Sequence, residues 1–75
     1  MTTTFHGRLR ELRDRRGLNA TQLAARIGRT EQMVHFYEKG DVIPPIEIIY
    51  ALASALDVPV TELVNDGIRF GEETA

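Results

Sequence analysis

Three glycines divide the first forty residues of the chain into helical segments. Gly17, Gly28 and Gly40 each follow directly on a segment in which apolar residues recur every three or four positions. Glycine readily takes the left-handed backbone conformation in which many helices end. The spacing therefore predicts three short helices, over about residues 4–16, 20–27 and 31–39.

The second and third predicted helices are joined by a very short connection. Asn19 and Thr30 are favourable N-cap residues, and Glu31 lies in a first turn, where the helix dipole favours a negative charge. Two helices joined by a three- or four-residue turn that contains glycine form a helix-turn-helix. A plain helical hairpin of a bundle, with no role in DNA binding, is the alternative.

The rest of the chain also has a helical pattern. Residues 45–56 predict a fourth helix that is apolar on nearly all sides. Such a helix must be buried on more than one side, either at the centre of the domain or against a partner chain. Leu63 and Val64 anchor a short fifth helix. We therefore expect an all-α, compact five-helix domain over residues 1–67, and a tail over residues 68–75 that is loosely ordered or lies at a dimer interface.

Length and composition exclude several classes of protein. The 75 residues allow one small domain, and 43% apolar with 27% charged residues is typical of a soluble globular chain. There is no cysteine for a disulfide or a thiolate metal site. His6 and His35 lie on different predicted helices without a third ligand. We therefore expect no metal and no cofactor. So short a chain rarely builds a catalytic pocket, which argues against an enzyme. Without an apolar membrane span or a signal peptide, a cytoplasmic location is expected.

Charge is distributed unevenly along the chain. Residues 1–40 carry eight of the nine basic residues and four acidic ones, for a net charge of +4, whereas residues 41–75 have a net charge of −6. This asymmetry indicates a basic face for a polyanion. A well-mixed, solvated surface is the alternative.

These segments resemble the phage-repressor and Cro-type helix-turn-helix family, also called the xenobiotic-response-element family. The resemblance covers about residues 5–65 without a gap. The matching motifs are Leu9-x-x-Leu12-Arg13, Gly17-Leu18-Asn19, Gln22-Leu23-Ala24-x-x-Ile27-Gly28-x-Thr30, Val34-x-x-Tyr37-Glu38-Lys39-Gly40, Pro44 and Leu52-Ala53-x-Ala55-Leu56-x-Val58.

The resemblance implies that the third helix lies in the major groove of double-stranded DNA. At about 100° per residue, one arc of this helix, opposite Met33, Val34 and Tyr37, points away from the core. The base-contacting candidates that follow from the resemblance are Thr30, Glu31, Gln32, His35 and Phe36. The carboxamide of Gln32 suits an adenine edge, the carboxylate of Glu31 suits the amino group of cytosine, and Phe36 suits a thymine methyl group.

The resemblance also implies contacts outside the base edges. Asn19 matches the family's phosphate contact, and Arg13, Arg29 and Lys39 are further phosphate candidates. The positions of Arg13 and Glu38 correspond to an ion pair between the first and third helices. Two independent surface charges are the alternative.

Several residues depart from the family pattern. Ala20 replaces a usual glutamine, residues 41–43 lack the usual basic side chain, and Glu31 and Phe36 are unusual in a surface that faces phosphates. Fewer phosphate contacts mean weaker binding with less dependence on salt. Met33, Phe36 and Tyr37 are therefore also candidates for a protein-binding surface.

The nearly apolar fourth helix predicts a homodimer. Ile46, Ile49, Ala53 and Leu56 can fill the core of the domain, which leaves a second apolar face without a cover. The predicted dimer contacts are Ile48, Leu52, Ala55 and Leu63. The alternative is that the fifth helix covers this face within one chain.

The leading hypothesis is a sequence-specific DNA-binding transcriptional regulator that acts as a dimer on a palindromic operator. The alternative is a protein-interaction module of the same fold, such as an antitoxin, an anti-repressor or a scaffold subunit, with weak or no DNA binding.

Overall fold

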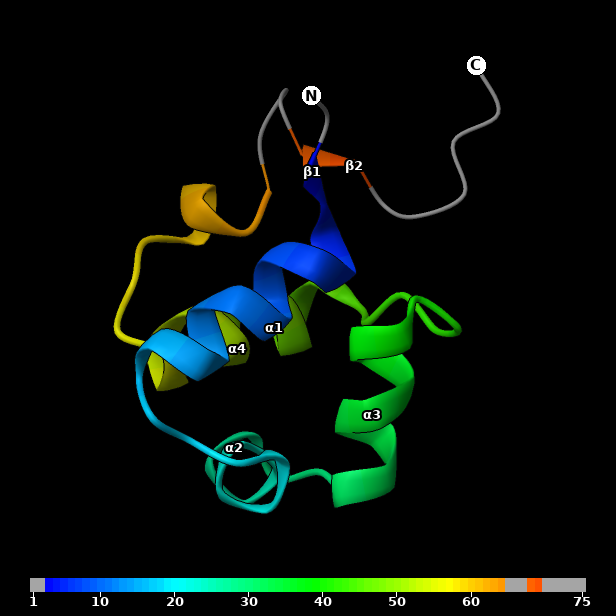
Figure 1. Cartoon of the computed structure of the whole chain (residues 1–75), viewed down its shortest axis with the longest axis vertical. Coiled ribbons are helices and arrows are strands. Elements are labelled where there is room, and N and C mark those ends of the chain that lie inside the picture. The colour runs from blue at the N-terminus through cyan, green and yellow to red at the C-terminus, as the bar shows by residue number, and fades with distance from the viewer. Residues whose placement is uncertain (1–2, 65–67, 70–75) are drawn as a thin grey trace.

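Four α-helices form the body of the described part of the molecule, and the glycine spacing predicted three of them. The computed structural model describes residues 3–64 and 68–69. The helices are α1 (Phe5–Arg15), α2 (Ala20–Ile27), α3 (Glu31–Lys39) and α4 (Ile46–Ala55), shown in Figure 1. The bounds of α2 and α3 are the predicted ones, and α1 is one residue shorter at each end. Among the described residues, no helix is long and apolar enough to span a membrane.

Local signals at the helix ends explain these bounds. The side chains of Thr4, Asn19 and Thr30 each accept a hydrogen bond from a backbone N–H in the first turn of the helix that follows. Gly28 and Gly40 end α2 and α3 with φ angles of +69° and +84°, in the left-handed region where glycine is favoured.

The core lies between α1, α2, α3 and α4. Helix α3 packs on α1 and α2 through Val34 and Tyr37, which are both buried. In Figure 1, α3 runs along one side of the molecule, with α2 beside its lower end. Two neighbouring helices and the core therefore set the orientation of α3, while Glu31, Gln32 and His35 on its other face are exposed.

The prediction of a fifth α-helix is wrong. A single 3₁₀ turn, η1 (Val60–Glu62), stands in its place after Pro59. The backbone N–H groups of Glu62 and Leu63 donate to the carbonyl groups three residues earlier, as in a 3₁₀ helix. One α-type bond follows, from the Val64 backbone N–H to the Val60 carbonyl at 3.0 Å, so the segment amounts to a single turn within the described residues.

The first residues of the predicted tail are paired with the beginning of the chain. Strand β1 (Thr3–Thr4) pairs in parallel with β2 (Ile68–Arg69), with Thr3 opposite Ile68. The remaining predicted tail residues, 70–75, lie outside the described residues.

The predicted orientation of α4 needs a correction. Ile48 and Leu52 are 4% and 0% exposed, and Leu63 is also fully buried, whereas Ile46, predicted to fill the core, is 58% exposed. Ala55 is half-buried. Helix α4 packs against α2 and η1, so one chain covers both of its apolar faces. The face that was assigned to a partner chain is therefore largely buried within one chain.

Candidate nucleic-acid interface

Helix α3 presents a polar face to solvent at the end that follows the short turn. Glu31, Gln32 and His35 are exposed, as is the N-cap residue Thr30, while Phe36 is half-buried. Within the described part of the chain, the carboxamide of Gln32 has no hydrogen-bond partner. Both its donor and its acceptor are therefore available, as bidentate contact with a base edge requires.

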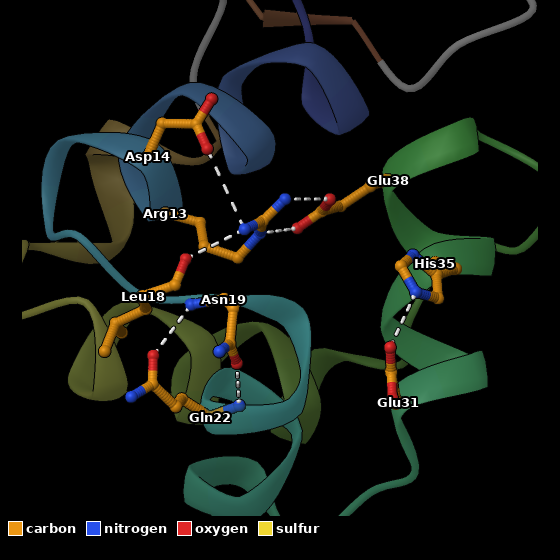
Figure 2. Close-up of polar contacts among 8 residues, drawn as sticks. All are labelled: Arg13, Asp14, Leu18, Asn19, Gln22, Glu31, His35 and Glu38. Atoms are coloured by element: carbon orange, nitrogen blue, oxygen red, sulfur yellow. Dashed lines mark hydrogen bonds and ion pairs between the residues drawn. The ribbon is translucent and has the colours of Figure 1, made fainter.

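The carboxylate of Glu31 is held by two neighbouring side chains. The Thr21 hydroxyl donates to Oε1 at 2.9 Å, and Nε2 of His35, one turn along α3, lies 3.2 Å from Oε2. Figure 2 shows the contact between Glu31 and His35. The hydrogen bond from Thr21, followed by that from His35, lowers the pKa of Glu31, so the side chain is negatively charged at neutral pH.

An ion pair joins α1 to the end of α3. Arg13 donates from Nε to Oε2 of Glu38 at 2.6 Å and from a terminal nitrogen to Oε1 at 3.0 Å. Its other terminal nitrogen donates to the Leu18 carbonyl at 2.8 Å, and Figure 2 shows all three contacts. The hydrogen bond to Glu38 raises the pKa of Arg13, which remains charged.

The ion pair with Glu38 changes the role that the sequence predicted for Arg13, which was contact with a phosphate. Its side chain is only 14% exposed, and each of its donating nitrogens is engaged with Glu38 or Leu18. A phosphate would have to displace these partners, so we do not retain Arg13 as a phosphate contact. Its geometry suits a link that holds α3 against α1.

Asn19 closes the start of α2 with a reciprocal pair of hydrogen bonds. Its side-chain oxygen accepts from the Gln22 backbone N–H at 2.8 Å, and its own N–H donates to the Gln22 side chain at 2.8 Å (Figure 2). Asn19 is exposed and lies at a helix N-terminus, where an anion is favoured. Contact with a phosphate remains a prediction.

Most arginines of the basic half are engaged within the chain. Arg8 pairs with Glu11 and Glu62, and Arg15 also pairs with Glu11. Arg26 bonds to the carbonyl of Ala55, the last residue of α4, and Arg16 bonds to the carbonyl of Asp57, two residues further along the chain. Arg8 and Arg16 lie beside Glu62 and Asp57, which are outside residues 1–40, so the net charge of +4 overstates the charge available for a polyanion.

Two of the predicted phosphate contacts remain accessible. Arg29 lies in the turn between α2 and α3 and is exposed, and within the described residues its side chain bonds only to the carbonyl of its neighbour Gly28. Lys39 is exposed at the end of α3, 3.5 Å from Asp41. Both flank the exposed face of α3, one at each end.

Sequence comparison and fold comparison agree on the family. A family profile described as helix-turn-helix matches residues 9–63. The chain belongs to this family. The prediction made from the motifs is thereby confirmed.

The relatives of this helix-turn-helix chain include named regulators. The chain is 39% identical over 62 residues to the transcriptional repressor RstR of the cryptic phage CTXphi in Vibrio cholerae, an alignment that covers 83% of this chain and 56% of RstR. It is 34% identical over 58 residues to PF1851 of Pyrococcus furiosus, which carries the name of an HTH-type transcriptional regulatory protein. That alignment covers 77% of this chain and 18% of PF1851. The chain thus spans about half or less of these relatives.

A solved structure matches over most of both chains. The crystal structure of the restriction-modification controller protein C.AhdI from Aeromonas hydrophila superposes with a TM-score of 0.77 at 38% identity, covering 80% of this chain and 87% of that one. This likeness supports the four-helix arrangement seen here.

Sequence reasoning missed one residue of the candidate interface. Thr21 was not among the candidates, although its hydroxyl is bonded to Glu31 across the turn. The two residues are ten positions apart and on different helices, so neither helical periodicity nor a capping pattern connects them.

Proposed function

We propose that this helix-turn-helix protein is a sequence-specific DNA-binding transcriptional repressor, with α3 in the major groove. The observation that carries the proposal is the exposed carboxamide of Gln32, which has no partner among the residues that the structure describes. It lies beside the oriented carboxylate of Glu31, on a helix held by its core contacts and the Arg13–Glu38 pair. The names of RstR and C.AhdI, a repressor and a controller protein, support it.

The test compares base contact with phosphate contact. Binding to genomic DNA fragments is measured at low and moderate salt, first to identify a preferred site and then with two variants. Gln32→Ala is expected to weaken binding to the preferred site by roughly 1–3 kcal/mol while leaving non-specific binding nearly unchanged. Arg29→Ala is the contrasting variant and is expected to weaken binding to all sequences.

The same measurements distinguish DNA binding from the alternative function, a protein-interaction module. A protein-interaction module of this fold would bind DNA weakly and without preference, and Gln32→Ala would change nothing. Equal losses on all fragments would show that Gln32 is not a base-contacting residue.

We further propose that the protein acts as a homodimer on a palindromic operator, through a face other than the predicted one. The large apolar side chains left exposed in the described residues are Val42, Ile43, Ile46 and Tyr50. They lie in the connection between α3 and α4 and on the first turns of α4. A dimer through this patch would cover apolar surface that one chain leaves in water.

The dimer is tested by sedimentation across a range of concentrations. Ile46→Asp is expected to shift the protein toward monomer with its helix content retained, because Ile46 is 58% exposed in one chain. Ser54→Asp, at an exposed position on the same helix, is the matched control and leaves the dimer intact. A wild-type chain that stays monomeric at high micromolar concentration would contradict the proposal.

A further inference from the structure

Three side chains from both helices of the helix-turn-helix form a connected group on the exposed face. Thr21 lies on α2, and Glu31 and His35 lie one turn apart on α3. The Thr21 hydroxyl is 2.9 Å from Oε1 of Glu31, and Nε2 of His35 is 3.2 Å from Oε2. Each oxygen of the carboxylate therefore has its own neighbour, and the carboxylate is oriented from both sides.

The protonation of this group follows from its hydrogen bonds. The pKa of Glu31 is lowered, mainly by the Thr21 hydroxyl, so its carboxylate is an acceptor only. Nε2 of His35 must then carry the hydrogen of the contact. Since a carboxylate oxygen has two lone-pair sites, each oxygen of Glu31 can still accept one more hydrogen bond.

An oriented group that only accepts hydrogen bonds discriminates among the bases. In the major groove, cytosine presents its N4 amino group, whereas guanine and thymine present carbonyl oxygens that a carboxylate repels. Adenine presents an amino group beside the N7 acceptor, which would face the second carboxylate oxygen. Cytosine therefore fits this carboxylate best.

Orientation matters because Glu31 is otherwise free to turn. Its side chain is about half exposed, and a long exposed side chain loses rotamer freedom when it binds. A hydroxyl on the neighbouring helix reduces that loss, because it holds the carboxylate in place before DNA arrives.

We propose that Thr21 is a specificity-determining residue of the DNA-binding face: it positions Glu31, and through Glu31 the protein prefers cytosine at one place in each half-site. Thr21 is a positioning residue and needs no contact with a base itself. This inference rests on the proposed function, because it applies only if α3 contacts base edges.

The experiment measures base preference rather than affinity alone. Wild-type protein and variants are used to select binding sites from a DNA library randomised over the operator, and the preference at each position is compared. Thr21→Val keeps the shape and removes the donor. It is expected to lower the preference for cytosine at one half-site position by about two- to tenfold, the effect of one hydrogen bond, with other positions and non-specific binding unchanged.

Two matched variants isolate the hydroxyl and the carboxylate. Thr21→Ser retains the donor and is expected to keep the wild-type preference. Glu31→Gln replaces an acceptor-only group by one that also donates, so cytosine should lose its advantage at the same position. A carboxyl titration by NMR gives an independent readout, in which Thr21→Val raises the pKa of Glu31 toward its ordinary value.

The possible results separate this inference from the function on which it rests. If the wild-type protein selects a defined site and Thr21→Val selects the same site with the same preferences, the part assigned to Thr21 is overturned and the proposed function stands. A wild-type protein that selects no site at all overturns the proposed function, and this inference with it.

Discussion

Removing the guanidinium group of Arg13 leaves the carboxylate of Glu38 without its charged partner in a nearly closed environment. The side chain of Glu38 is 7% exposed and that of Arg13 is 14% exposed. Breaking a fully buried pair by removing one partner costs about 3–5 kcal/mol, because the other charge is left uncompensated. Since some water reaches this pair, we expect Arg13→Ala to lower the free energy of unfolding by about 3 kcal/mol.

The reverse substitution is expected to cost less. In Glu38→Ala, Arg13 keeps its hydrogen bond to the Leu18 carbonyl, and its long side chain can turn toward water. We expect a loss of about 2 kcal/mol, smaller than that of Arg13→Ala.

Urea unfolding of the two single variants and the double variant forms a double-mutant cycle. The expected coupling energy between Arg13 and Glu38 is about 2 kcal/mol, because the pair has two charge-assisted hydrogen bonds and little exposure. The control cycle uses Glu11 and Arg15, an i,i+4 pair on the outside of α1 with side chains 47% and 60% exposed. Such a pair contributes about 0.3–0.5 kcal/mol.

One outcome of the two double-mutant cycles would contradict this expectation. Equal coupling energies for the two pairs would refute the argument that burial makes the Arg13–Glu38 pair strong. It would also remove the physical reason for regarding this pair as the link that fixes α3 against α1.

Three further predictions concern the helix end, the core and the DNA. Gly40→Ala should destabilise the fold by about 2–3 kcal/mol, because φ is +84° and a Cβ would lie 2.8 Å from Nδ1 of His6. Gly28→Ala should cost only about 1 kcal/mol, because φ is also positive there but the added Cβ would meet open space. Thermal unfolding measures both glycine variants, and equal losses would show that His6 moves aside freely. Leu52→Ala should cost about 2–5 kcal/mol in urea unfolding since Leu52 is fully buried in one chain, whereas a loss below 1 kcal/mol would contradict the observed orientation of α4. Lys39→Ala should flatten the dependence of log K on log salt by about one unit, and an unchanged slope would exclude Lys39 as a phosphate contact.

The sequence by itself determined the first three helices. Their bounds depend on contacts within four residues along the chain, such as the bond from the Asn19 side chain to Gln22 and the left-handed turn at Gly28. Interactions of this range can be recognised from neighbouring residue types, which is why the predicted ends agree with the structure to within one residue. The family motifs depend on the same local signals, and the family was confirmed.

Tertiary structure alone decided the orientation of α4. A helix that is apolar on nearly all sides has no periodicity that distinguishes one face from another, so the sequence assigned Ile46 to the core and Ile48 to a partner. In the structure Ile48 is buried within one chain and Ile46 is exposed, although Ile49, Ala53 and Leu56 lie in the core as predicted, because α4 packs against both α2 and η1.

The available charge of the candidate interface was also decided by tertiary structure. Composition predicted a basic face, but Arg8 pairs with Glu62, 54 residues away, and Arg16 bonds to Asp57, 41 residues away. The link from Thr21 to Glu31 likewise joins two helices. A sequence shows which charges and donors a chain carries. Which of them meet is set by the packing of helices that are distant in sequence, because a hydrogen bond or ion pair forms only at a separation of a few ångströms.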